Sequence, residues 1–180
     1  MNRFRLRGNL QRIIYLFSLT ILFPNSRLFL KQADLLENKS IKGESVKFLN
    51  GNIVFIKGDL TLECQEGQHF EKKGLIKLYN NVNSSQNDQS LTSDTLKFYS
   101  KENRLFGIGN THAWNQDYDL RADSIIVFTE KDSGIATGNV KLIQKGQIIT
   151  ARKIVYKKNP DIDGVSYIAY GDVIIQDSSI

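Results

Sequence analysis

The chain has 180 residues, of which 41% are hydrophobic, so it is long enough to form one domain with a sizeable core. Its formal net charge of +5 favours a nucleic-acid or anionic partner, but residues 1–33 hold six basic residues and no acidic one. The rest of the chain is close to neutral. Because a nucleic-acid-binding domain carries its excess charge on the folded part, we expect no nucleic-acid partner. A single cysteine, Cys64, excludes an internal disulfide.

Residues 1–33 have the features of a leader. A basic segment precedes residues 13–23, an unbroken apolar or hydroxyl run that suits a secretory signal and is short for a bilayer-spanning helix of about twenty residues. The cleavage site is poor, because Lys31 stands two positions before Ala33. The alternatives are a cleaved signal peptide, an uncleaved N-terminal anchor, and a buried cytosolic segment. The first two place residues 34–180, the expected folded domain, outside the cytoplasm.

Residues 34–180 contain a repeat of about 29 residues. Gly-Asn-type triplets begin at residues 51, 80, 109 and 138, and a fifth begins at 171 after an insertion in the loop at 157–164. Apolar columns keep the same spacing: Leu62, Leu91, Leu120 and Ile149; Leu96, Ile125 and Ile154; and His69, Phe98, Val127 and Tyr156. Such regularity indicates stacked copies of one supersecondary unit.

Each unit is predicted to consist of short strands. Apolar and polar residues alternate, and the alternation slips by one residue at Asp94, Asp123 and Arg152, which predicts a bend or bulge there. Glycine-containing turns separate the strands, and no amphipathic helix is expected beyond the leader. The polar stretch 80–90 is expected to form an exposed loop or a ragged edge. The fold class is therefore all-β.

Two phrases carry a family resemblance. "LRADSIIVF" is followed by "GIATGNV", and "IITARKIVY" is followed by "YIAYGDV". In this ordered recurrence, residues 33–177 resemble the periplasmic lipopolysaccharide-transport proteins of the LptA/OstA-like type. The resemblance implies stacked antiparallel strands in an open, V-shaped β-jelly roll whose groove carries lipopolysaccharide acyl chains. It leaves open the branch: bridge protein, membrane-anchored docking subunit, or outer-membrane relative.

The resemblance also implies partners and a location. The sheet edges are expected to pair with further copies or with other lipopolysaccharide-transport components, in the periplasm or anchored at the inner membrane. Burial of acyl chains is worth about 0.8 kcal/mol per methylene, so no enzymatic step is needed. The residues expected to line the groove are Leu62, Leu96, Phe98, Leu120, Ile125, Val127, Val140, Leu142, Ile149, Ile154 and Tyr156. The alternative is an exported β-solenoid with a closed core that serves as a scaffold or adhesin.

No residue pattern indicates catalysis, a metal or a cofactor. Cys64 falls in a column of small residues with Ser93, Ala122 and Ala151, and His69 in a column of packing residues. Arg152 interrupts the column of Asp94 and Asp123, which breaks the paired carboxylates that a glycosidase needs.

Three further expectations concern polar and aromatic residues. Asp94, Asp123 and Asp132 are expected to cap turns. Trp114 and Tyr118 are the candidates for an exposed aromatic patch. His112, beside Trp114, has no evident partners for binding a metal.

Overall fold

The computed structural model describes residues 27–159 and 164–177. Residues 1–26 of the expected leader lie outside the described residues. One 3-10 helix, η1 (Glu71–Lys73), follows β4. The strands are β1 (Phe29–Gln32), β2 (Leu35–Ile41), β3 (Glu44–Lys57), β4 (Leu60–Phe70), β5 (Leu75–Gln86), β6 (Gln89–Tyr99), β7 (Arg104–Trp114), β8 (Tyr118–Phe128), β9 (Ser133–Gln144), β10 (Gln147–Asn159), β11 (Gly164–Tyr170) and β12 (Ile174–Asp177).

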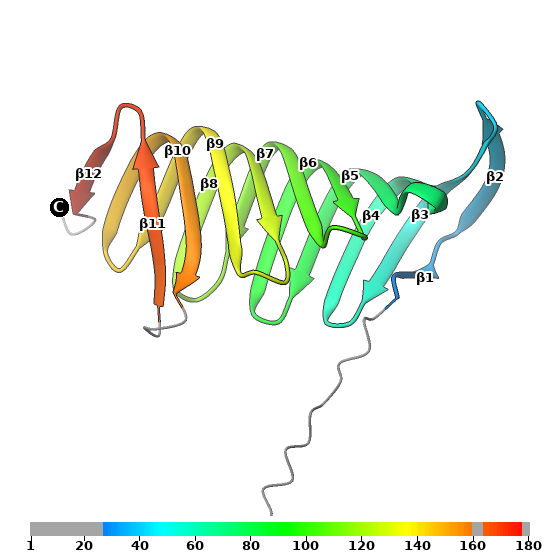
Figure 1. The fold of residues 1–180 in the computed structure, drawn as a ribbon, viewed down its shortest axis with the longest axis horizontal. Helices are drawn as coiled ribbons and strands as arrows, with labels where there is room; N and C mark the ends of the chain where they lie inside the picture. The colour runs from blue at the N-terminus through cyan, green and yellow to red at the C-terminus, as the bar shows by residue number, and fades with distance from the viewer. Residues whose placement is uncertain (1–26, 160–163, 178–180) are drawn as a thin grey trace, which may run out of the picture.

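The strands form one antiparallel sheet of twelve strands, in which β3 to β11 follow one another in sequence order. β1 and β2 both pair with β3, and β11 and β12 both pair with β10. Figure 1 shows the strands succeeding one another along the long axis, with β1 and β2 at one end and β11 and β12 at the other. The sheet does not close on itself. The prediction of an open, all-β stack of antiparallel strands is confirmed.

The sequence period corresponds to a hairpin of two strands. β5, β7 and β9 begin at Leu75, Arg104 and Ser133, and each start is 29 residues after the last. The hairpin turns between the strands are short, and several contain a non-glycine residue with positive φ, such as Asn87 at 53° and Asn103 at 49°. Asparagine tolerates this left-handed region better than most residues do.

Each long strand bends at a bulge near its middle. Between β7 and β8, two residues, Gly109 and Asn110, lie opposite the single residue Asp123, and the register shifts there. Both bulge residues have positive φ, 76° and 42°. Equivalent register shifts occur in every pairing from β3–β4 to β9–β10. The bulges therefore lie where the sequence alternation slips, and they align into one crease along the molecule.

The crease divides the sheet into two walls. The first wall consists of β1, β12 and the arms 53–57, 60–64, 82–86, 89–93, 111–114, 118–122, 140–144 and 147–151. The second wall consists of β2, β11 and the arms 44–50, 66–70, 75–79, 95–99, 104–108, 124–128, 133–137 and 153–159. Buried side chains from both walls form one hydrophobic cluster. We call the edges opposite the crease, where the hairpin turns lie, the rims.

The expectation of an exposed loop at residues 80–90 is wrong. Residues 80–86 complete β5, and β6 begins at Gln89 after a short turn. Val82 and Ser84 face the core and are buried, while the alternate residues Asn83 and Ser85 lie on the outer face. Buried and outward residues alternate here as in any strand. The sequence does not reveal this alternation, because polar serine and asparagine residues occupy inward as well as outward positions.

Candidate functional site: the interior between the two walls

All eleven residues predicted to line a groove lie on the inner face of the sheet. Val127 and Tyr156 are half-buried, and the other nine are buried. The first wall contributes Leu62, Leu120, Val140, Leu142 and Ile149, and the second wall contributes Leu96, Phe98, Ile125, Val127, Ile154 and Tyr156. The two sets face each other across the interior. Their role in lipid binding stays a prediction.

The odd-numbered strands supply inner residues that the sequence columns did not include. Ile76 and Leu78 of β5 pair with Phe98 and Leu96 and are fully buried. Phe55 of β3 is also fully buried. These residues can be identified once the strand pairing is known, because a residue directly opposite a predicted inner residue on an antiparallel strand lies on the same face of the sheet. The apolar lining is therefore continuous from β3 to β10.

Glycine makes room for the tyrosine at one position of the lining. Gly134 pairs with Tyr156, and a Cβ built on Gly134 would lie 2.4 Å from the tyrosine Oη and Cε1. Any larger residue at Gly134 displaces the ring. Burial raises the pKa of Tyr156, and the neighbouring Tyr118 and Asp132 raise it further. Burial likewise raises the pKa of Tyr118 to about 12. Both phenols are therefore neutral at physiological pH.

A lysine connects the two rims. Lys57 ends β3 in the first wall, and its Nζ donates to the backbone carbonyl of Ser100 at 3.1 Å and to the side-chain oxygen of Asn103. Ser100 and Asn103 lie in the β6–β7 turn, on the rim of the second wall. The ammonium also lies 5.9 Å from the ring centroid of the buried Phe98. Lys57 thus covers the interior at its open edge, and we call this set of contacts the rim latch.

Turns on the second rim also bond to one another. Ser100 donates from its backbone N–H and its hydroxyl to the Gly74 carbonyl, at 2.8 and 3.0 Å. Thr129 does the same to the Asn103 carbonyl, at 2.9 and 3.1 Å. These bonds link three successive turns along one rim. The rim latch differs from them because it joins the two walls.

Side-chain bridges join neighbouring strands along the outer side of the crease. Asn110 Nδ2 donates to Asp94 Oδ2 at 2.9 Å, and Asn139 Nδ2 donates to Asp123 at 3.0 and 3.2 Å. Asn52 donates to Asp34 in the same way at 2.9 Å. Asp94 and Asp123 therefore bridge neighbouring strands at the bulges. We expected these two aspartates to cap local turns, but each of them accepts a hydrogen bond from an asparagine on the neighbouring strand.

Arg152 keeps the bridge with exchanged chemistry. Its partner position holds Asp172 in place of asparagine, and Arg152 donates to Asp172 Oδ2 from Nε at 2.7 Å and from Nη2 at 2.5 Å. The backbone contact is also kept, since the Arg152 N–H donates to the Gly171 carbonyl at 2.9 Å, as Asp34 does to Gly51. The departure from aspartate at Arg152 is thus matched by a second departure at Asp172.

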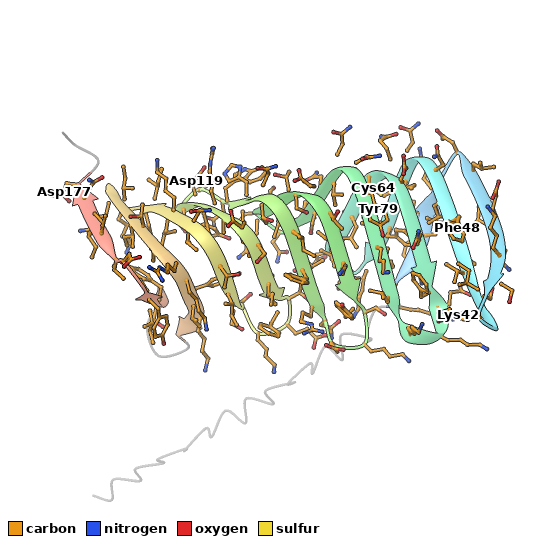
Figure 2. The ribbon with its side chains drawn as sticks, turned by 90° about the horizontal axis from the view of Figure 1, so that it is seen from above. Lys42, Phe48, Cys64, Tyr79, Asp119 and Asp177 are labelled. Atoms are coloured by element: carbon orange, nitrogen blue, oxygen red, sulfur yellow. The ribbon has the colours of Figure 1, made fainter. Side chains whose placement is uncertain are left out.

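Cys64 and His69 are packing residues of the interior. Burial raises the pKa of the Cys64 thiol to about 11, and its Sγ donates to the Glu66 carbonyl at 3.1 Å. Burial also lowers the pKa of His69, which packs edge-on against Phe55 with ring centroids 5.5 Å apart. Figure 2 labels Cys64 of β4 close to Tyr79 of β5. Within the described residues, no group of three or more His, Cys, Asp or Glu is placed to hold a metal.

Trp114 and Tyr118 do not form one patch. Trp114 lies half-buried on the outer face of the first wall, stacked on His112 with ring centroids 4.5 Å apart. His112 Nε2 lies 2.7 Å from Asp119 Oδ2. Tyr118, by contrast, packs against the hydrophobic core. The alternation of faces along β7 and β8 separates the two aromatic residues.

Two surface depressions differ in their lining. The larger, about 840 Å³, lies at the crease and is lined mainly by polar residues, among them Asn80, Asn81, Asn83, Asp94 and Asn110. The smaller, about 280 Å³, lies at the β2 end and includes Phe48, Glu66 and Tyr79. Neither depression opens into the apolar interior, which the side chains of the two walls fill.

Large hydrophobic residues are exposed at both ends of the stack. At one end Phe29, Leu35, Leu36 and Ile41 are exposed on β1 and β2. At the other end the exposed residues lie on β11, β12 and the bend between them: Ile168, Tyr170, Val173, Ile174 and Ile175. Figure 2 shows Lys42 and Asp177 labelled at these opposite ends. The strands at each end also have unpaired backbone edges.

Three comparisons place the chain among known proteins. A family model described as OstA-like protein matches residues 25–113. A sequence search among curated proteins finds no match. Among solved structures, the chain is similar to LptH, the LptA homologous periplasmic component of the conserved lipopolysaccharide transport device from Pseudomonas aeruginosa. That similarity has 14% sequence identity and a TM-score of 0.43, and it covers 79% of this chain and 94% of that one.

Proposed function

Because a family model described as OstA-like protein matches residues 25–113, we propose that this chain takes part in lipopolysaccharide transport as a periplasmic lipid-transfer protein. The proposed role is non-enzymatic: the interior shields acyl chains while the lipid moves across the periplasm. Residues 1–26 of the leader, which lie outside the described residues, serve in this proposal as an export signal or an inner-membrane anchor, whereas Phe29–Gln32 of the expected leader forms β1 of the sheet. Among the described residues, no helix is long and apolar enough to cross a membrane.

One observation carries the proposal: the apolar lining runs without a break from β3 to β10. Every strand along this path contributes inner apolar residues, and both walls take part. Each methylene of an acyl chain transferred from water to such a lining contributes about 0.8 kcal/mol. An acyl chain of ordinary length is thereby held without a covalent bond. The acyl chain can slide along the long axis of the protein, because successive strands present the same apolar surface.

Lipid entry requires that the walls separate at the rims. Inner residues of the two walls now contact one another, so an acyl chain must take the place of these contacts. The bulges at the crease are the part of each strand that absorbs a change of angle, and the rim latch at Lys57 is the contact that must open. The loss of wall-to-wall packing is offset by equivalent packing against the lipid.

The exposed ends support assembly into a bridge. β2 is exposed at all seven positions and β12 at all four. Both strands sit at open edges of the sheet, and strand addition there continues the antiparallel ladder into another chain. In this proposal the partners are further copies or other lipopolysaccharide-transport components. The interior then extends from one chain to the next.

Equilibrium binding of lipopolysaccharide to the purified chain tests the function. We expect saturable binding, and a weaker affinity when an inner residue such as Ile125 is changed to Asn. The change Ile143→Asn is the matched control, since Ile143 lies on the outer face of the first wall. Equal affinities for wild type and Ile125→Asn, with both proteins folded, contradict the role of the interior.

The alternative is a scaffold or adhesin with a permanently closed core. The dense packing of the interior favours this alternative, since residues such as Phe55, Phe98 and Ile125 are fully buried. It predicts no lipopolysaccharide binding at any concentration. It also predicts that a proline in β12, which blocks strand addition, leaves the oligomeric state unchanged.

A further inference from the structure

The outer face of the second wall has a row of apolar residues. Phe106 pairs with Ile126, Ile126 with Ile135, Ile135 with Val155, and Val155 with Ile168. All five point away from the core. The first four are half-buried and Ile168 is 59% exposed. The row crosses five strands, β7 to β11. Contiguous apolar surface of this kind is uncommon on a protein face that meets only water.

Aromatic and basic residues flank the row. Lys97 Nζ lies 5.9 Å from the centroid of the Phe106 ring, and Lys153 Nζ lies 5.6 Å from that of Tyr170. Arg104 lies 4.5 Å from the Tyr99 ring centroid. These cations lie along aromatic surface on the same outer face, so their apolar stems cover the sheet while their charged groups reach its surface.

From β5 to β11 the strands of this face have no carboxylate, whereas at β4 the face contains the exposed Glu66. Its outward positions from β5 to β11 include five cations and no Asp or Glu. The acidic residues nearby are in the rim turns, where Glu102 pairs with Arg104 at 2.8 Å. The cations are Lys77, Lys97, Arg104, Lys153 and Lys157. Over the same strands, the outer face of the first wall differs, since it contains Asp119 beside its basic residues. From β5 onward the excess of cations is therefore on the second wall, and it does not follow from the net charge of the domain.

We propose that the outer face of the second wall docks on an anionic lipid bilayer. A row of Ile, Val and Phe enters the interfacial region, the tyrosines lie at headgroup level, and the lysines and Arg104 contact lipid phosphates. Aromatic residues and long basic side chains with an apolar base are the residues favoured at this interface. A protein partner would have to supply both an apolar strip and several unpaired carboxylates in register with the lysines.

Docking by this face has a consequence for orientation. The face runs along the strands' stacking direction, so the long axis of the chain lies parallel to the bilayer. The rims and β12 remain outside the contact, while β11 takes part in it through Ile168 and Tyr170. A docked chain therefore keeps its interior entrance and the edge of β12 available at the membrane surface. It is a different state from a chain in the middle of an end-to-end bridge.

Vesicle flotation of the purified folded chain tests the proposal. We expect binding to vesicles of phosphatidylethanolamine and phosphatidylglycerol, little binding to phosphatidylcholine alone, and a loss of binding as salt is raised. Lys97→Gln and Lys153→Gln should each weaken binding about fivefold, since each basic residue near an anionic surface adds about that factor. Ile126→Glu should abolish it. Lys141→Gln and Ile143→Glu are the matched controls on the first wall and should bind as wild type.

Several results overturn the proposal. Equal binding to both kinds of vesicle, or equal losses for first-wall and second-wall variants, shows that this face is not the contact. Binding that is insensitive to salt and to the lysine variants indicates uptake of acyl chains by the interior instead. Lipopolysaccharide affinity measured on the same variants separates the two sites, because the outer-face changes should leave it unchanged. The lysine variants keep the test valid if Ile126→Glu proves unfolded.

Discussion

Arg152 and Asp172 form an ion pair across the crease at the position where the preceding bridge joins Asp123 to Asn139. Both members of the bridge have changed together, and the Gly171 carbonyl still accepts the Arg152 N–H. The geometry of the bulge is thus maintained with different chemistry. The bridge's function is to align neighbouring strands at the bend.

Exchanging this bridge for the other type tests that function. Arg152→Asp alone places two carboxylates together and should lower the free energy of unfolding by about 1 kcal/mol. Adding Asp172→Asn recreates the Asp–Asn pair of the other bulges and should restore most of the loss. Urea denaturation of the two single variants and the double variant gives the coupling energy. Because both side chains are largely exposed, the coupling energy should be small. Strictly additive effects of the two changes contradict a direct bridge.

A glycine at the crease should be less replaceable than a glycine in an open turn. Gly138 and Gly43 have nearly the same φ, 75° and 77°, so alanine costs about 1–2 kcal/mol at either position through the backbone alone. At Gly138 the new Cβ would also lie 2.2–2.8 Å from Asp123 atoms, whereas at Gly43 nothing lies within 4 Å. Thermal or urea denaturation should therefore show a clearly larger loss for Gly138→Ala. Equal losses contradict the close approach.

His69 should make stability depend on pH. Burial lowers its pKa in the folded state below the ordinary value of 6.5, so the unfolded chain binds the proton first as the pH falls. The stability it contributes is complete above about pH 6.5 and is lost as the pH falls from there through the folded-state pKa. His69→Phe, an apolar replacement matching Phe98 in the same column, should flatten the stability profile as the pH falls below about 6.5. An unchanged slope contradicts the assignment.

The rim latch should limit the separation of the walls. Lys57→Ala removes two bonds between the walls and should lower the free energy of unfolding by about 1–2 kcal/mol. It should also speed amide exchange at the end of β3 and in the β6–β7 turn, and speed lipopolysaccharide uptake. Lys101→Ala is the matched control, because Lys101 donates to the Lys72 carbonyl within the second rim. If both variants behave alike, Lys57 does not hold the walls together.

Residue periodicity predicts much of this fold. Leu62, Leu120 and Ile149 recur at one spacing and are buried on one face, because each hairpin repeats the same register. The slip in alternation at Asp123 predicts a bulge, since only a bend keeps both arms facing the core. The class, the strand order and the inner face follow from such local patterns.

Other features depend on contacts between distant residues. The rim latch joins Lys57 to a turn more than forty residues away, and nothing in the local pattern near Lys57 indicates it. The outer apolar row is not evident from the sequence, because Ile126 stands between the inner residues Ile125 and Val127, and only its pairing with Phe106 and Ile135 on the neighbouring strands places it in a row. The chemistry of Arg152 became clear only when its partner across the strands was known.

Site-specific photo-crosslinking tests the central claim, that acyl chains lie between the walls. Crosslinkers at the inner positions Leu142, Val127 and Tyr156 should capture lipopolysaccharide, whereas one at Ile143, next to Leu142 on the outer face of the first wall, should not. Adjacent positions in one strand make the comparison independent of expression and of overall lipid affinity. Equal capture at Leu142 and Ile143, or capture at neither with folded protein, contradicts the account.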